Sequence, residues 1–93
     1  MRTIERSTRF KRDYKREMKG QHRATLAADL LPALIALASD VPLDPKYQDH
    51  ALSGDWAGYR DCHVKPDLVL IYAKPGELTL RLARLGSHSE VFG

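Results

Sequence analysis

The sequence predicts an α+β domain in which two helices form a hairpin that packs against one face of an antiparallel sheet. Apolar residues recur at helical spacing between residues 8 and 39, and three stretches with strand character follow between residues 58 and 84. A chain of 93 residues has the size of one domain, so we expect a single domain over residues 1–93. Helices on one face leave the other sheet face partly open, and we expect the functional site there.

The first half of the chain predicts a short edge strand and two helices. Thr3–Glu5 fits the strand, and Ser7 or Thr8 can cap the first helix by accepting a hydrogen bond from a free backbone N–H. One face of this helix carries Phe10, Tyr14 and Met18, and Gly20 ends it. The second helix is expected over Gln21–Ser39, and Pro32 is its weak point because proline lacks a backbone donor.

The second half predicts a loop and then a sheet. Residues 40–57 contain two prolines and a glycine, so we expect a loop with a brief strand near Ala51–Ser53. In Gly58–Val64, alternation turns Asp61 and His63 to one side and Cys62 to the other, where it is buried. Asp67–Ala73 is apolar on both faces, which is typical of a central strand.

The last strand and the tail complete the sheet region. Lys74–Glu77 predicts a tight turn. Leu78–Arg84 alternates again, and this pattern buries its three leucines, Leu78, Leu80 and Leu82. The tail, residues 86–93, is polar apart from Val91 and Phe92, and no element is predicted there.

Charge is distributed unevenly along the chain. Residues 1–24 contain nine Lys or Arg against three acids, a net charge of +6, whereas the remaining residues carry six basic and nine acidic side chains, a net charge of −3. A cationic end on a mildly acidic body is typical of proteins with a polyanionic partner, and nucleic acid fits better than a membrane because the apolar side of this segment is thin. A solvated helix face would give the same pattern.

Several classes of protein are excluded by composition. No apolar run approaches the ~20 residues that cross a bilayer, and the charged N-terminus does not resemble a signal peptide. The single cysteine, Cys62, forbids an internal disulfide and a cysteine-based zinc site. We therefore expect a cytoplasmic protein without a membrane partner.

Titratable side chains that could carry proton-transfer chemistry gather in the second half of the chain. They lie on, or at the ends of, segments that should pair into one sheet: His50, Asp61, His63, Asp67 and His88. Cleavage of RNA without a cofactor needs a base for the 2′-hydroxyl, an acid for the departing 5′-oxygen and positive charge near the phosphate. Histidine suits both proton transfers because its ordinary pKa of about 6.5 lies near working pH.

Each of these residues also has a simpler interpretation. A single surface histidine is usually solvated or a structural hydrogen-bonding group, and Asp67 can cap a turn. Metal binding is disfavoured because no HxH or HxxxH spacing occurs, so we predict neither a metal nor another cofactor. Trp56 and Phe92 lie in irregular segments where they could stack on bases. From pattern alone, the chain is a small basic α+β domain with a possible RNA substrate.

A family resemblance makes this hypothesis more specific. The segment DPKYQDHALSGDWAGYRDCHVKPD from Asp44, the following LVLIY and the ending RLGSHSEVFG resemble the YafQ-type toxins of the RelE superfamily. These are bacterial mRNA interferases of type II toxin–antitoxin modules. The likeness is strong over residues 44–93, whereas the helical first half matches in layout and basic character.

The resemblance implies a RelE-like fold, with a helical hairpin against a curved antiparallel sheet, and ribosome-dependent cleavage of mRNA in the ribosomal A site. It implies catalytic roles for the five titratable residues named above, and substrate contacts for Arg84 and Phe92. Arg84 has the same parity as Leu80 and Leu82, so we expect it at the end of its strand, turned toward the cleft. Leu85 stands where the family usually has threonine.

The implied mechanism is metal-independent acid/base catalysis with the 2′-hydroxyl as nucleophile. His50 or Asp67 would be the base and His88 the acid, while His63, oriented by Asp61, and Arg84 would stabilise phosphate charge. The basic helix would bind ribosomal RNA through Arg9, Lys11, Arg12, Lys15, Arg16 and Lys19.

The implied partners are the 70S ribosome with mRNA and a RelB- or DinJ-like antitoxin, in a hetero-oligomeric complex that binds DNA through the antitoxin. Two other functions stay open at this point. A ParE-like relative would inhibit DNA gyrase without RNA chemistry, and a non-catalytic module would only bind nucleic acid. The histidine and aspartate set argues against the ParE-like function, because a protein that only binds does not need five titratable groups around one cleft. The non-catalytic module would be favoured if the three late histidines could be replaced without relieving growth arrest.

Overall fold

The computed structural model describes residues 1–93, and its first elements follow the expected order. Strand β1 (Thr3–Arg6) leads into helix α1 (Thr8–Glu17). The Ser7 hydroxyl caps α1, as predicted: it accepts a hydrogen bond from the backbone N–H of Phe10 at 2.9 Å. The same hydroxyl donates to the carbonyl oxygen of Ala83 at 2.8 Å, so the start of α1 is fixed to the sheet.

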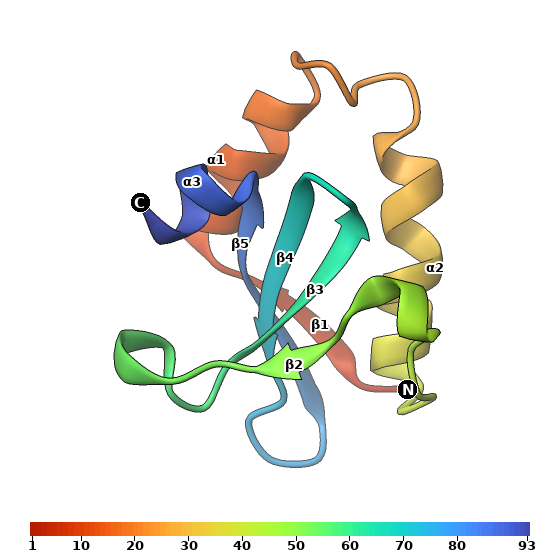
Figure 1. The fold of residues 1–93 in the computed structure, drawn as a ribbon. Coiled ribbons are helices and arrows are strands. Elements are labelled where there is room, and N and C mark those ends of the chain that lie inside the picture. Colours follow the sequence, from red (N-terminus) through yellow and green to blue (C-terminus); the bar gives the residue numbers. More distant parts are fainter.

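Helix α2 is shorter than expected. It spans Leu26–Ala38, and residues 21–25 form turns instead of its first part. Pro32 lies inside the helix, and its missing N–H leaves the carbonyl of Ala28 without its usual partner four residues on. In Figure 1, the connection between α1 and α2 runs over the top of the molecule.

Five strands form one sheet in the order β1-β5-β4-β3-β2. The other strands are β2 (His50–Ala51), β3 (Arg60–Lys65), β4 (Leu68–Ala73) and β5 (Thr79–Gly86), and the short helices η1 (Pro45–Tyr47) and η2 (Gly54–Trp56) flank β2. β1 pairs in parallel with β5, while the remaining pairs are antiparallel. All six residues of β4 are buried, which confirms it as the central strand.

The two faces of the sheet carry different residues. Toward α1 and α2 the sheet contributes the main core, in which leucines of β4 and β5 pack with Tyr72, Cys62 and Phe10. The opposite face carries a smaller apolar cluster centred on Val69 and Ile71, which is covered by the segment around η2, including Leu52 and Tyr59, and by the C-terminal end of the chain. The prediction of one covered and one partly open face is therefore confirmed.

Three details differ from the sequence-based expectation. Leu78 is 80 % exposed because the turn continues through it and β5 begins only at Thr79. Met18 is exposed because α1 ends at Glu17. The tail forms a helix, α3 (His88–Phe92), which begins with a capping box between Ser87 and Glu90.

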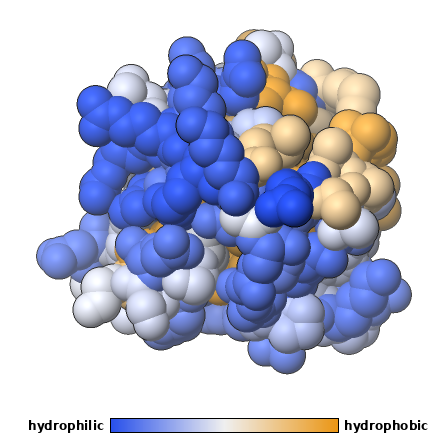
Figure 2. Space-filling model, turned by 90° about the horizontal axis from the view of Figure 1, so that it is seen from above, coloured by the Kyte–Doolittle hydropathy of each residue, from blue (hydrophilic) through white to orange (hydrophobic).

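The surface has a hydrophilic and an apolar side. Seen from above, hydrophilic side chains cover most of the face, and apolar atoms gather at the right, over α2 (Figure 2). Leu31 and Ile35 of α2 contribute to the exposed apolar surface. No helix has the length and apolar character needed to cross a membrane.

Candidate active site

Asp61 lies at the centre of the candidate site. Strand alternation turns this carboxyl to the open face, where the register sets Asp61 opposite His50 of β2 and opposite Ile71 of β4. The residue is only 2 % exposed, although it lies beside the open face. Its neighbour Cys62 points into the core, where burial raises the pKa of the thiol to about 12, so this thiol stays protonated and is no nucleophile at neutral pH.

His50 is held by its Nδ1 atom. This nitrogen lies 2.8 Å from the carbonyl oxygen of Gln48 and 3.0 Å from Oδ1 of Asp61. Both neighbours are hydrogen-bond acceptors, so Nδ1 carries the proton. Its N–H points at the carbonyl oxygen of Gln48, which leaves Oδ1 of Asp61 without a hydrogen-bond donor. In the neutral ring, the lone pair is then on Nε2, where it can accept a proton from a substrate.

His63 shares the open face with Asp61 but is oriented by a different group. Its Nδ1 lies 3.3 Å from the carbonyl oxygen of Pro66, in the turn that leads to β4. The expectation that Asp61 orients His63 is therefore wrong, because the Asp61 carboxylate contacts His50 instead. A β-bulge between His63 and Lys65 ends the regular pairing at this point.

His88 is the first residue of α3, and its ring packs against Phe92 with centroids 4.7 Å apart. The charge of Asp61 reaches all three imidazoles. Burial raises the pKa of Asp61, and protonated His50, His63 and His88 each oppose this rise. The structure thus places His50 in direct contact with Asp61, and it leaves His63 and His88 to interact with this acid through their charge.

The other predicted acid, Asp67, faces away from this group. Its Oδ2 accepts a hydrogen bond from Nε2 of Gln21 at 3.0 Å, and its Oδ1 lies 3.1 Å from Nε2 of His22. These partners belong to the connection between α1 and α2, and the side chain of Asp67 is 55 % exposed. The side chain of His22 is itself only 14 % exposed.

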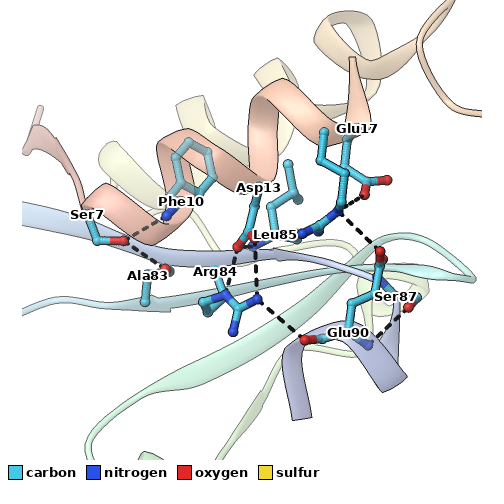
Figure 3. A network of polar contacts seen from close by, with 10 residues as sticks. Ser7, Phe10, Asp13, Glu17, Ala83, Arg84, Leu85, Ser87 and Glu90 are labelled. Atoms are coloured by element: carbon cyan, nitrogen blue, oxygen red, sulfur yellow. Dashed lines mark hydrogen bonds and ion pairs between the residues drawn. The ribbon is translucent and has the colours of Figure 1, made fainter. Parts of the chain in front are cut away.

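Arg84 does not follow the predicted parity. A register shift between Ile71 and Tyr72 breaks the alternation after Leu82, so Arg84 pairs with Ile71 instead of continuing the core-facing row. Its Nε donates to Oδ2 of the buried Asp13 at 2.7 Å (Figure 3). Arg84 still lines a hollow beside Phe92, but Asp13 neutralises its charge.

Arg16, which we expected to bind ribosomal RNA, forms ion pairs within the protein instead. Its guanidinium donates to Asp13, Glu17 and the carbonyl oxygen of Leu85, and Nε lies 3.1 Å from Glu90. With these partners, the Arg16 guanidinium connects α1 to β5 and α3, and it is not free to bind RNA. The remaining predicted RNA-binding cations of α1 and its C-terminal end form no ion pair: Arg9, Lys11, Arg12, Lys15 and Lys19.

Two polar hollows lie near the candidate residues. One, of about 510 Å³, is lined by Arg9, Asp55, Trp56 and Arg84 together with residues 90–93 at the C-terminal end of the chain, Phe92 among them. The other, of about 430 Å³, lies between η1 and the end of β3, where Lys46 and His63 line it. No group of three or more His, Cys, Asp or Glu side chains is arranged to hold a metal ion.

Sequence reasoning missed the role of Asp13, although a signal was present. Phe10, Asp13, Tyr14 and Glu17 are spaced i, i+3, i+4 and i+7, so they lie on one face of α1, and three of them are buried. Ser87 and Glu90 likewise have capping-box spacing just before Val91 and Phe92, which is a recognised sign of a helix start.

The geometry defines a small basic α+β domain with three imidazoles around a buried carboxyl, and comparison with known proteins identifies the family. The family described as "Bacterial toxin of type II toxin-antitoxin system, YafQ" matches residues 2–93, and the chain belongs to this family. It is 40 % identical over 92 residues to the mRNA interferase toxin YafQ of Escherichia coli strain K12, covering 99 % of this chain and 97 % of that one.

Solved structures agree with this assignment. A metal-bound toxin from Helicobacter pylori superposes with a TM-score of 0.87 at 46 % identity, covering 99 % of this chain and all of the other. The toxin in an E. coli DinJ–YafQ complex superposes with a TM-score of 0.85 at 39 % identity over the full length of both chains. The α+β fold predicted from sequence is therefore confirmed as that of the YafQ toxins.

Proposed function

We propose that the chain is an mRNA interferase that cuts mRNA in the ribosomal A site by metal-independent acid/base catalysis. The names of its curated relatives support the endoribonuclease activity. The observation that carries the proposed mechanism is the 3.0 Å contact between Nδ1 of His50 and the buried Asp61, whose charge also interacts with those of His63 and His88. The 2′-hydroxyl of RNA is an internal nucleophile, so the reaction needs proton transfer and charge stabilisation from the protein.

His50 is the general base in this proposal. Its Nδ1–H is held by Gln48, which leaves Nε2 to accept the proton of the 2′-hydroxyl. The 2′-oxygen forms a bond to phosphorus while the bond from phosphorus to the 5′-oxygen breaks. His88 donates a proton to that oxygen, and the products are a 2′,3′-cyclic phosphate and a 5′-hydroxyl. Asp67 stays the alternative base that the resemblance implies, and for this role its carboxylate would have to leave its contacts with Gln21 and His22.

Charge on the phosphate is stabilised by protonated His63 in this scheme. Asp61 contributes a buried carboxyl whose Oδ1 lies 3.0 Å from Nδ1 of His50. Arg84 contributes less than the resemblance implied, because Asp13 neutralises its guanidinium. Arg9 lines the same hollow without an ion pair, and it is the cation that is free to approach a phosphate there.

The RNA strand would follow the two polar hollows. Phe92 and Trp56 line the hollow beside α3 and offer aromatic surfaces for bases, an interaction of about 1–3 kcal/mol per base in other proteins. The five unpaired cations of α1 would contact ribosomal RNA phosphates. The ribosome as partner requires that the protein acts in the cytoplasm.

A cognate antitoxin is the second proposed partner. The E. coli relative forms a complex with DinJ, and we propose that a RelB- or DinJ-like antitoxin covers the basic face and the cleft of this chain. The assembly would be hetero-oligomeric and would bind DNA through the antitoxin.

The proposal is tested with purified ribosomes, a defined mRNA and the His88→Ala variant. We expect the variant to lose at least ~100-fold in cleavage rate while ribosome binding persists, since one positioned proton transfer contributes about 10²–10⁴. Wild-type products should carry a 2′,3′-cyclic phosphate or 3′-phosphate. A 3′-hydroxyl end would contradict the mechanism.

The choice of base is tested with His50→Gln and Asp67→Asn in the same assay. If His50 is the base, His50→Gln loses ~100-fold or more and Asp67→Asn only a few-fold. The reverse order would assign the base to Asp67. A supercoiling assay with DNA gyrase separates the ParE-like alternative, and growth arrest by a chain without His50, His63 and His88 would indicate a non-catalytic module.

A further inference from the structure

We infer that Asp13 of α1 is a positioning residue for the two α3 side chains of the proposed site, His88 and Phe92. Asp13 is only 3 % exposed and faces neither the histidine group nor solvent. It lies where α1, the end of β5 and α3 meet, as Figure 3 shows. The expected loss of cleavage rests on the proposed nuclease function, whereas the expected change in the position of α3 does not.

Four hydrogen bonds converge on the Asp13 carboxylate. Oδ2 accepts from Nε of Arg84 at 2.7 Å and from the backbone N–H of Leu85 at 3.0 Å, and Oδ1 accepts from Arg16 at 2.9 Å and from Nη2 of Arg84 at 3.3 Å. Burial by itself would raise the pKa of Asp13, but these bonds outweigh it and hold the pKa below its usual range. The carboxylate is therefore ionised at neutral pH.

The two arginines carry the connection from Asp13 to α3. Arg84 donates from Nη2 to the backbone carbonyl oxygen of Glu90 at 3.4 Å. Arg16 approaches the Glu90 carboxylate at 3.1 Å and donates to the carbonyl oxygen of Leu85 at 2.8 Å. Glu90 is in the middle of α3, between the ring of His88 and the ring of Phe92 in the sequence.

Helix α3 has few other attachments. It has five residues, and Val91 is its only buried side chain. Helices of this length do not persist by themselves, so the position of α3 depends on its tertiary contacts. Without Asp13, Arg84 would be a buried cation without its main partner, and it would have to move toward solvent past α3. His88 would move with α3.

The close approach of Arg16 requires Gly86. A Cβ atom at position 86 would lie 2.6 Å from Nη2 of Arg16 and 3.1 Å from Oε1 of Glu90. The Gly86→Ala substitution therefore disturbs the same junction without removing Asp13 or Arg84. Because the Arg16 guanidinium is held by several partners, it cannot swing aside without losing contacts to Asp13 or Glu90.

The experiment compares Asp13→Asn and Gly86→Ala with Glu17→Gln as matched control. Glu17 is also a buried acid of α1, but its side chain is hydrogen-bonded only to Arg16, and not to Arg84 or the backbone of β5. We expect kcat for mRNA cleavage to fall about 10- to 100-fold in Asp13→Asn with KM within about twofold, since misplacing a reacting group by ~1 Å can cost ~100-fold. Glu17→Gln should stay within about threefold of wild type.

Hydrogen exchange and NMR supply a readout that does not depend on activity. The amides of Val91 and Gly93 should exchange faster in Asp13→Asn and Gly86→Ala, relative to amides of β4, and the ring signals of His88 and Phe92 should shift. If the wild-type chain cleaves no mRNA, the proposed function fails while this readout still tests the positioning role.

A double variant separates positioning from stability. Replacing a buried ion pair by apolar residues is often neutral or stabilising, so Asp13→Leu with Arg84→Met should recover much of the stability that Asp13→Asn loses. We expect cleavage to stay low in the double variant, because the link to Glu90 is absent. Recovery of full cleavage together with stability, or unchanged α3 signals in Asp13→Asn, would overturn the inference.

Discussion

The capping box of α3 allows one prediction to be worked from the structure. Ser87 Oγ accepts a hydrogen bond from the N–H of Glu90 at 3.2 Å, and Glu90 Oε1 accepts one from the N–H of Ser87 at 2.8 Å. Ser87→Ala removes the first of these bonds, and loss of such a cap typically costs ~1 kcal/mol. Since RT is about 0.59 kcal/mol, the population with α3 open should rise about fivefold.

Hydrogen exchange measures this opening directly. The N–H of Val91 donates to Ser87 O at 3.1 Å and that of Gly93 to Ser89 O at 2.9 Å, so both amides are protected only while α3 is formed. In Ser87→Ala, we expect both to exchange about fivefold faster, with β4 amides unchanged. Opening also removes His88 from the site, so NMR signals of its ring should shift in proportion to the open fraction.

Ser89→Ala is the matched control on the same helix. Ser89 is exposed and its side chain makes no hydrogen bond. Alanine has the higher helix propensity, so exchange at Val91 and Gly93 should be unchanged or slower in this variant. Equal exchange rates in Ser87→Ala and Ser89→Ala would show that the cap does not hold α3, and the reasoning would be refuted.

Three further predictions concern charge and metal. Burial raises the pKa of Asp61, so the contribution of this group to stability falls as pH rises through that raised pKa. At neutral pH, Asp61→Asn should therefore melt at the same or a higher temperature than wild type, while its cleavage activity falls. A lower melting temperature together with full cleavage activity would contradict this prediction. The double variant Lys11→Glu, Lys15→Glu should bind ribosomes more weakly, and its affinity should depend less on salt concentration. Lys74→Glu, at the turn before β5, should change neither the affinity nor its salt dependence. If Lys74→Glu had the same effects as the double variant, α1 would have no special role in ribosome binding. A chelator selective for transition metals should leave ribosome-dependent cleavage unchanged, and loss of cleavage restored by added metal would show that the proposed mechanism is incomplete.

The sequence predicted the sheet and the covered face well because their signals are local. The apolar run of β4 corresponds to its full burial, whereas alternation in β3 predicted that Cys62 is in the core but not that Asp61, on the opposite face, is buried as well. The cap of α1 was predictable for the same reason, because the Ser7 hydroxyl accepts its hydrogen bond from Phe10, only three residues away. Parity alone did not show how Arg84 reaches the cleft: the register shift after Ile71 turns it out of the row of Leu80 and Leu82, and it lines the hollow beside Phe92, at the strand end where we expected it.

The contacts of the candidate site residues could be predicted only in part. Parity gave Asp61 and His63 a common face, yet the partner of Asp61 is His50, because β2 pairs with β3 at that position. Asp67 is adjacent to His63 along the hairpin, but its direction is set by Gln21 and His22 from the other half of the chain. Such contacts follow from tertiary packing, which one sequence does not encode locally.

The three imidazoles differ in how firmly the fold holds them, and this difference bears on function. His50 and His63 lie at or on strands of the sheet, and backbone carbonyl oxygens fix their Nδ1 atoms. His88 instead lies on a five-residue helix whose position depends on one apolar anchor, a capping box and the Asp13 junction. The proposed acid thus belongs to the least firmly attached element of the site. Changes at residues remote from the chemistry, such as Asp13, should therefore affect the protonation of the leaving group more than the activation of the nucleophile.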